Sequence, residues 1–307
     1  MGYLVSILIT GGAGFIGSNT AFYLCSRGFK VSVIDSFERS SISFEELLGA
    51  GIRVFRGDVK DTSIISSILQ GVDVVVHAAA YVDVAESMAK PLEYLNNNVI
   101  GTASVASVCF NRGVGLIYIS SAAVYGDPIK LPIDEDHPTK PLSPYGLSKL
   151  LGEEVVKFYG GLGLRFTILR LFNVYGPRQN RSYAGVITRF IERVKAGLPP
   201  VIYGDGLQTR DFVHVVDVAK AVELAIEKKL PQQILNIASG KPVKIKDLAY
   251  MVIKLSGLDK EPIYTNPRPG DIKHSWGSIA KAEEQLNYKP SINLEEGLKN
   301  LYENWSF

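Results

Sequence analysis

The sequence has 307 residues, of which 46% are hydrophobic, so the chain can bury a sizeable core and form about two domains, or one large domain with an appended lobe. Charged residues make up 21% and the formal net charge is +2, which is too balanced to indicate a nucleic-acid or membrane surface. No apolar run approaches the ~20 residues needed to cross a bilayer. The two cysteines are expected to be buried thiols in a reducing, cytoplasmic compartment. The four histidines are scattered, and no metal site is expected.

The first half of the chain alternates short apolar runs with segments of helical period. Strands are predicted at residues 3–9, 30–34, 52–55, 72–76, 116–119 and 165–169, and helices at 14–27, 61–70, 91–112 and 144–160. Continuous apolar strands that alternate with helices predict a parallel sheet covered on both faces. Right-handed crossovers then give an α/β, doubly wound parallel sheet of the Rossmann type.

The second half changes character, because proline and glycine become denser. We interpret residues 173–207 and 239–307 as a smaller, mixed C-terminal lobe that binds the substrate. The segment 208–238, with a helix near 215–229 and a strand at Gln233–Ile237, is expected to return to the main sheet. The predicted domains are therefore 1–172 with 208–238, and 173–207 with 239–307.

A glycine-rich loop, TGGAGFIG, follows the first predicted strand and opens the first helix. Glycine at Gly11, Gly14 and Gly17 allows a tight turn, a close backbone approach to a pyrophosphate, and close packing of helix on strand. Phe15 and Ile16 begin the helix, whose free N–H groups would face the negative charge. Because the loop stands between a strand and a helix, it predicts a dinucleotide site.

Asp35 ends the second strand, 18 residues after Gly17. An acid in this place can accept hydrogen bonds from an adenosine ribose and would repel a 2′-phosphate. Ser36 and Phe37 follow, so no arginine stands directly after the acid, and NAD is favoured over NADP. The alternative is that Asp35 merely ends a strand.

Two further strands end in residues that suit a dinucleotide. Asp58 and Val59 follow the third strand, where an acid and an apolar side chain can border an adenine. Ala78 and Ala79 follow the fourth strand, and their small side chains leave room for the diphosphate and ribose. All these segments fall at the carboxyl ends of strands, where ligands bind in this architecture.

Tyr145 and Lys149 stand at i and i+4 and therefore share one face of a predicted helix. A nearby ammonium and a cationic nicotinamide are expected to lower the pKa of the tyrosine and make it a general base. The same spacing recurs at Tyr250 and Lys254, so the spacing alone is weak evidence for a catalytic site. Ser121, just after the fifth strand, lies 24 residues before Tyr145, whereas the same distance before Tyr250 falls inside a predicted helix. We therefore interpret the first set as a catalytic site and the second pair as surface residues.

These motifs, together with the Asn-Asn-Val segment at 97–99, resemble the extended short-chain dehydrogenase/reductase family over nearly the whole chain. More narrowly, they are similar to its UDP-glucose 4-epimerase group. The resemblance implies that Tyr145 is the base, that Ser121 shares the hydrogen bond to the sugar hydroxyl, and that Lys149 holds the nicotinamide ribose. Asn98 matches the asparagine on the cofactor side.

Two alanines after Ser121 bear on the reaction. Family dehydratases carry an Asp-Glu pair there and decarboxylases commonly a Glu, because elimination needs a proton donor and an acceptor. Ala122 and Ala123 can be neither, whereas oxidation followed by re-reduction needs one base and the hydride carrier. The resemblance therefore implies a UDP-hexose 4-epimerase that interconverts UDP-galactose and UDP-glucose. The alternatives are another nucleotide-sugar epimerase, a net NAD-dependent dehydrogenase or reductase, and a non-catalytic NAD-sensing protein.

Several residues of the second lobe match the nucleotide side of the family. The resemblance places Asn173 near the diphosphate, with Arg210 and Arg268 as its clamp. It places Asp271 at the uridine ribose and Tyr203 beside the uracil. A planar guanidinium suits bidentate contact with phosphate. Each arginine alone is more often a surface charge, but the set at family spacing indicates a UDP-sugar site.

Ser275 stands four residues after Asp271, where galactose-specific relatives carry a bulky tyrosine that limits space at the 2-substituent of the sugar. We therefore expect UDP-N-acetylhexosamines to be admitted as well. The alternative is that His274 or Trp276 fills the gap.

Members of the family commonly pair the helices that match those predicted at 91–112 and 144–160 between two subunits, so the resemblance implies a homodimer. The stretch 99–109 is apolar on more than one face, which fits such a contact, although a purely intramolecular core would give the same pattern. A UDP-sugar is the expected partner, and neither nucleic acid nor membrane is expected.

Overall fold

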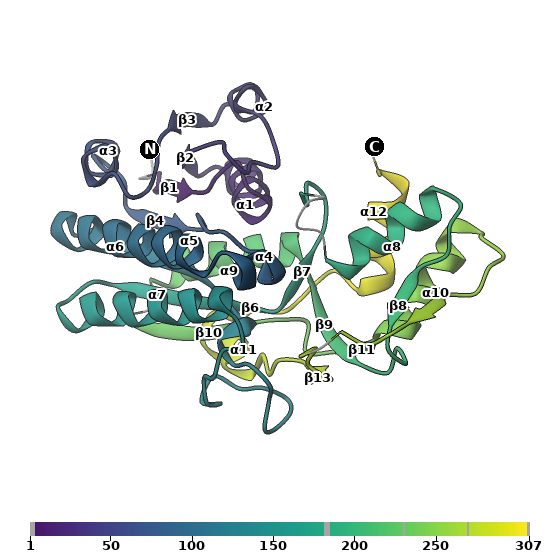
Figure 1. Ribbon diagram of the computed structural model, residues 1–307. Coiled ribbons are helices and arrows are strands. Elements are labelled where there is room, and N and C mark those ends of the chain that lie inside the picture. Colours follow the sequence, from purple (N-terminus) through teal and green to yellow (C-terminus); the bar gives the residue numbers. More distant parts are fainter. Residues whose placement is uncertain (1–3, 181–184, 230, 269, 306–307) are drawn as a thin grey trace.

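The computed structural model describes residues 4–180, 185–229, 231–268 and 270–305 (Figure 1). Its main sheet consists of β1 (Ser6–Thr10), β2 (Lys30–Asp35), β3 (Arg53–Arg56), β4 (Val74–His77), β5 (Gly115–Ser121), β6 (Phe166–Leu171) and β10 (Gln233–Ile237). Within the described ranges these seven strands are parallel and have the order β10-β6-β5-β4-β1-β2-β3. The predicted doubly wound sheet is therefore confirmed.

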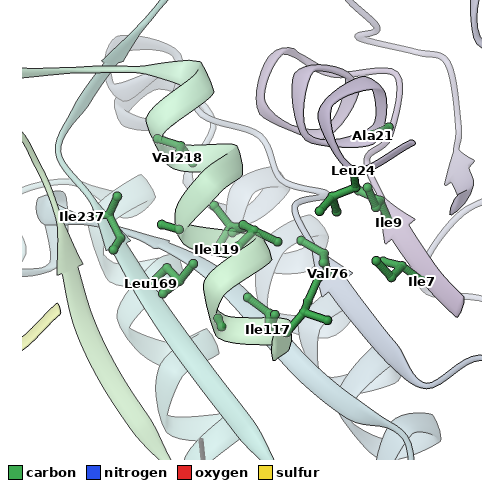
Figure 2. Packing of buried hydrophobic residues seen from close by; sticks show 14 of the residues in the cluster. Ile7, Ile9, Ala21, Leu24, Val76, Ile117, Ile119, Leu169, Val218 and Ile237 are labelled. Atoms are coloured by element: carbon green, nitrogen blue, oxygen red, sulfur yellow. The ribbon is translucent and has the colours of Figure 1, made fainter. Parts of the chain in front are cut away.

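Helices cover both faces of the sheet. One face carries α1 (Phe15–Ser26) and α9 (Val215–Lys228), and the other carries α3 (Thr62–Ile68), α6 (Gly101–Arg112) and α7 (Pro144–Gly161). Each face of the sheet has its own hydrophobic core, the first beneath α1 and α9 and the second beneath α3, α6 and α7. Side chains of β1 alternate between them: Ile7 and Ile9 lie in the first core and Leu8 in the second, all fully buried. Figure 2 shows the first core, where Leu24 of α1 and Val218 of α9 pack on the strands. Burial of aliphatic surface on both faces stabilises the sheet.

A smaller lobe has its own strands, helices and core. Its central strand is β9 (Thr209–His214), and Phe190, Leu248 and Leu298 are among its fully buried core residues. The other strands are β7 (Asn173–Tyr175), β8 (Val201–Tyr203), β11 (Pro242–Lys244), β12 (Ile263–Thr265) and β13 (His274–Ser275). The helices are α8 (Val186–Lys195), α10 (Ile245–Ser256) and α12 (Leu294–Glu303).

Two elements cross the predicted domain boundaries. The strand β9 falls in the segment 208–238 but pairs with β7, β11 and β13, whereas α9 and β10 belong to the main sheet and its cover. The helix α11 (Ala280–Leu286) falls in the C-terminal segment, yet Ala282 and Leu286 pack in the first core of the main sheet. The domain limits therefore stay a prediction.

The helix predicted over 91–112 is interrupted. It consists of α5 (Pro91–Leu95), a π-helical turn at Asn96–Ile100, and α6. The side chain of Asn98 in this turn is buried and bonded to other segments, and π insertions often occur at functional sites.

The first strand, predicted at residues 3–9, begins at Ser6, and Tyr3 lies outside the described part. The helix α2 (Phe44–Gly49), which was not predicted, begins with a capping box between Ser43 and Glu46. Among the described residues, no helix is both long and apolar enough to cross a membrane.

Candidate active site

Two adjoining pockets lie at the carboxyl ends of the central strands, where ligands bind in doubly wound sheets. We call them the Tyr145 pocket and the Asp35 pocket. The predicted residues that line the Tyr145 pocket are Gly11, Gly14, Phe15, Ile16, Gly17, Ala78, Ser121, Tyr145 and Lys149. Those that line the Asp35 pocket are Gly11, Gly14, Asp35, Asp58, Val59, Ala78 and Ala79. The fold thus brings the predicted catalytic and cofactor residues to one edge of the sheet.

The glycine loop is shaped for close approach of a ligand. Gly11 has a φ of +65°, and a Cβ there would come within 2.6 Å of Ala79 Cα, so only glycine fits. The next helix begins at Phe15, and its N-cap is Gly14, which has no side chain to cap the first turn. Backbone N–H groups of that turn are therefore available to an anion. This cradle fits the diphosphate of a dinucleotide.

Asp35 is tied to the backbone around it. Its carboxylate accepts hydrogen bonds from Ala13 N at 2.9 Å and from Phe37 N at 2.8 Å. Burial raises the pKa of Asp35, and these two hydrogen bonds oppose that shift. The residue therefore fixes the glycine loop to the loop after β2 while also lining its pocket, and its contact with a ribose stays a prediction.

The helix α7 places Tyr145 and Lys149 one turn apart beside the end of β5. Ser121 Oγ accepts from Ala123 N at 3.1 Å, and its side chain lies near enough to Tyr145 to lower the pKa of that tyrosine. Lys149 is 3% exposed, and its Nζ donates to Ile119 O at 2.9 Å. The three predicted catalytic side chains therefore meet in one pocket.

Within the protein, burial has a larger effect on the pKa of Tyr145 than any side chain does, and the lowering expected from Lys149 together with a cationic nicotinamide stays a prediction. Burial raises the pKa of this tyrosine, and Ser121 opposes the shift only in part. Burial also lowers the pKa of Lys149 to about 7, against the opposing effect of Glu153.

A buried ion pair behind the Tyr145 pocket was missed from sequence. Arg170 Nε donates to Glu153 Oε1 at 2.9 Å and its Nη2 donates to Oε2 at 2.6 Å, with the side chains 3% and 0% exposed. Ser120 Oγ donates to Glu153 Oε1 at 2.6 Å, which ties the pair to β5. Two signals were present: Glu153 follows Lys149 by four residues on one helix face, and Arg170 stands inside an apolar strand.

Asn98 lies behind the wall of the Asp35 pocket. Its Nδ2 donates to Tyr81 O at 3.0 Å and to Ser148 Oγ at 2.8 Å, and its Oδ1 accepts from Tyr81 N at 2.8 Å. The neighbouring Asn97 lines the pocket instead. Asn98 thus holds the segment after β4 against α7, and its direct contact with a cofactor stays a prediction.

A third pocket, the arginine pocket, lies in the smaller lobe. The predicted residues that line it are Asn173, Tyr203, Arg210, Arg268 and Asp271. Arg268 Cζ lies 3.9 Å from the centroid of the Tyr203 ring, and Arg210 Nη2 donates to Asp271 Oδ1 at 2.6 Å. Pro269, between two of these residues, lies outside the described part.

Two more arginines of this pocket, Arg189 and Arg193 of α8, were missed from sequence. Together with Arg268, whose hydrogen bond has the largest effect, they lower the pKa of Tyr203. Their i and i+4 spacing on one helix face was the available signal. With Arg210 they surround the pocket with guanidinium groups, an arrangement that suits a diphosphate.

Ser275 lies in β13, in register with Arg210 of β9, and is half-buried. It is absent from the described linings of the Tyr145, Asp35 and arginine pockets. Its role at the sugar therefore stays a prediction. Over the described ranges, no group of three or more His, Cys, Asp or Glu side chains is arranged to hold a metal ion.

Comparison with known proteins gives consistent matches. A family model described as the NAD dependent epimerase/dehydratase family matches residues 7–238. A provisionally named UDP-glucose 4-epimerase of Methanocaldococcus jannaschii is 40% identical over 304 residues, which cover 97% of each chain. The crystal structure of UDP-glucose 4-epimerase with UDP-glucose from Thermotoga maritima is similar with a TM-score of 0.92 and 36% identity, over 97% of this chain and 98% of that one. UDP-N-acetylglucosamine 4-epimerase from Methanobrevibacter ruminantium M1, in complex with UDP-N-acetylmuramic acid, has a TM-score of 0.92 and 35% identity over 98% of both chains.

Proposed function

Because this chain belongs to the NAD dependent epimerase/dehydratase family, we propose that it is a UDP-hexose 4-epimerase that interconverts UDP-galactose and UDP-glucose. Its cofactor is NAD. One observation carries the proposal: Ser121, Tyr145 and the buried Lys149 share a pocket with the glycine loop. The arginine pocket supports a nucleotide diphosphate as the handle of the substrate.

In the proposed reaction, Tyr145 takes the proton of the 4-hydroxyl group and Ser121 shares the hydrogen bond to that oxygen. When bound, NAD supplies a reversible acceptor for the C4 hydride and a positive ring beside the tyrosine. Lys149, fixed at Ile119 O, is placed to hold the nicotinamide ribose. The 4-keto sugar turns about its diphosphate, and the hydride returns to the opposite face of C4.

The arginine pocket explains how the sugar can turn while the nucleotide stays fixed. Its lining includes four arginines, Arg189, Arg193, Arg210 and Arg268. One guanidinium group can bind two phosphate oxygens at once through two parallel N–H groups. We assign the diphosphate to these side chains and the uracil to the neighbourhood of Tyr203. The sugar would then be tethered only at its phosphate end.

Ala122 and Ala123 favour epimerisation over elimination. They begin a short 3-10 turn directly after Ser121. Loss of a hydroxyl group as water needs a proton donor and an acceptor at the sugar, and alanine provides neither. The proposed reaction needs only the base at C4 and the hydride acceptor.

The proposed substrate range includes UDP-N-acetylhexosamines. Its support is the small side chain of Ser275 and the likeness to the UDP-N-acetylglucosamine 4-epimerase of Methanobrevibacter ruminantium. A hydroxymethyl side chain leaves more room than the tyrosine of galactose-specific relatives.

We also propose a homodimer formed through α5, the π-helical turn, α6 and α7. Large apolar side chains on these helices are exposed, with Leu92 at 77%, Phe158 at 65% and Ile100 at 49%. A surface with so many apolar side chains is typical of a protein interface. A cytoplasmic location is proposed on the ground that Cys25 and Cys109 are free thiols.

The test is to incubate the purified chain with UDP-galactose, without added NAD, and to follow the sugar by proton NMR. A parallel tube contains UDP-N-acetylgalactosamine. Formation of the gluco sugar in the first tube supports an epimerase that retains its NAD, and formation in the second supports the wider range. No conversion after NAD is supplied would reject the UDP-hexose assignment and favour another nucleotide sugar or a net redox reaction.

A further inference from the structure

The Tyr145 pocket and the Asp35 pocket are two parts of one groove. Both are lined by Gly11, Gly14 and Ala78 along the sheet edge, and both are also lined by Arg39 and Tyr81. A dinucleotide that places its nicotinamide at Tyr145 and its adenosine at Asp35 must pass this shared section. The diphosphate, which lies between the two nucleosides, falls at that section.

Strand order explains why Arg39 and Tyr81 meet there. In the sheet, β1 lies between β2 and β4, so the loops after β2 and β4 flank the glycine loop that follows β1. Arg39 belongs to the loop after β2, and Tyr81 to the segment after β4. The guanidinium carbon of Arg39 lies 3.7 Å from the centroid of the Tyr81 ring, a close cation–π contact. The two flanking loops are thus joined across the groove by side chains.

Both ends of this contact are anchored. Arg39 is bound bidentately by Glu86 of α4 (Val84–Ala89), with Nη1–Oε2 at 2.5 Å and Nη2–Oε1 at 3.0 Å. The hydroxyl group of Tyr81 donates to Oε2 of Glu38 at 3.2 Å, and Glu38 directly precedes Arg39 in the chain. The backbone of Tyr81 is held at both N and O by Asn98. The side chains of Arg39 and Glu86 are each 24% exposed, so the ion pair is largely shielded from water.

We propose that Arg39, Tyr81 and Glu86 form a bridge that closes the groove over the diphosphate of bound NAD and slows its release. The proposal rests on the assignment of the two pockets to the cofactor. The N–H groups at the start of α1 are free to bind an anion, and Arg39, paired with Glu86, lines the same groove. The bidentate pair with Glu86 keeps the guanidinium over the groove, so release requires the bridge to open.

Retention of the cofactor has a clear use in the proposed reaction. The sugar is oxidised and then reduced by the same cofactor molecule, and loss of the reduced cofactor between the two steps would leave the 4-keto sugar stranded. A bridge made of two loops can open for the first loading and stay closed during turnover. Arg39, Tyr81 and Glu86 are therefore positioning residues for the cofactor.

The experiment measures how fast the full-length protein releases NADH. The protein is loaded with NADH and mixed with excess NAD, and the fluorescence of bound NADH is followed over time. Arg39→Gln, Glu86→Gln and Tyr81→Leu are each expected to speed release about tenfold, because each removes one of the contacts that close the bridge. The double variant Arg39→Gln/Glu86→Gln is expected to be no faster than the faster single variant.

Two further variants sharpen the test. Arg39→Lys keeps the charge but loses the planar fork, so its release rate is expected to fall between those of the wild type and Arg39→Gln. Arg27→Gln is the matched control, because Arg27 pairs with Glu223 at 2.8 Å and lines neither pocket of the groove. Its release rate is expected to stay within about twofold of the wild type.

The bridge is overturned if Glu86→Gln leaves release unchanged while Arg39→Gln speeds it, since Arg39 would then act by direct contact alone. It is also overturned if the three single variants release NADH at the wild-type rate with unchanged unfolding midpoints. Failure of the wild type to bind NADH would reject the cofactor assignment and the bridge together. Tight NADH binding without epimerisation would reject the proposed sugar reaction and leave the bridge to be judged by the release rates.

Discussion

Glu153 lies one helical turn after Lys149 on α7, and its carboxylate opposes the desolvation that lowers the pKa of Lys149 to about 7. The same carboxylate is bound bidentately by Arg170 of β6 and accepts a hydrogen bond from Ser120. Ser120 precedes the predicted catalytic Ser121 in β5. The structural core and the candidate site are therefore connected through one buried network.

The buried pair predicts a large loss of stability for Glu153→Gln. The substitution leaves the guanidinium of Arg170 buried without its charged partner, which typically costs about 3–5 kcal/mol in the free energy of unfolding. Glu154→Gln is the control, because Glu154 is exposed and pairs with Lys157 on the surface, where a loss of about 0.5 kcal/mol or less is expected. Urea unfolding of both variants measures the difference, and equal losses would contradict this reading of the pair.

The lowered pKa of Lys149 predicts a pH-dependent contribution to stability. In the unfolded chain the lysine has its ordinary pKa of 10.5, and in the folded chain about 7. Between these values the unfolded chain binds more protons, so the free energy of unfolding rises with pH from about 7 towards 10.5, and below 7 this group contributes no slope. Lys149→Met removes the group.

Urea unfolding of the wild type and of Lys149→Met at pH 6, 7, 8 and 9 isolates this contribution. The stability of the wild type minus that of the variant is expected to be constant from pH 6 to about 7 and then to increase. A difference that stays constant up to pH 9 would show that the pKa of Lys149 is not lowered.

Tyr145→Phe is expected to reduce the rate of epimerisation about 10²–10⁴-fold, because it removes the group that exchanges a proton with the 4-hydroxyl. Binding of UDP should remain, since the arginine pocket is untouched. The matched control is Tyr250→Phe, which lies in the second Tyr-x-x-x-Lys segment, where the tyrosine is 43% exposed and donates to Glu261. Steady-state rates with UDP-galactose measure both, and a comparable loss in the control would remove the distinction between the two segments.

Ser275→Tyr is expected to remove turnover of UDP-N-acetylglucosamine while it preserves turnover of UDP-glucose. The larger side chain takes up space that we assign to the acetamido group at C2 of the sugar. The ratio of kcat/KM for the two sugars is the measurement. If both values fall by the same factor, Ser275 does not select at the 2-substituent.

The parts of the molecule that could be predicted from sequence are those with a local pattern. The strands are continuous apolar runs, and the glycine loop must stand between a strand and a helix, so both follow from neighbouring residues. The pair Glu153–Arg170 joins distant segments that meet only because β5, β6 and α7 pack together. The contact of Arg39 with Tyr81 likewise exists only because the strand order is β4-β1-β2.

The pKa of Tyr145 shows a second limit. Spacing put Lys149 beside the tyrosine and predicted that it lowers the pKa together with the nicotinamide. Spacing does not give the depth of burial, which raises the pKa of Tyr145 and depends on the whole fold. The interruption of the predicted helix at Asn96–Ile100 is similar, because the contacts of Asn98 with Tyr81 and Ser148 are made only in the folded protein.

In the proposed reaction, hydride leaves C4 of the sugar and returns to it without reaching solvent. The most direct measurement is to convert UDP-galactose in D₂O and examine the product at C4 by proton NMR. The expected product is UDP-glucose that carries protium at C4, because the hydride is not exchanged with water. Deuterium at C4 would rule out the proposed reaction, since it would mean that the inverted centre received its hydrogen from water.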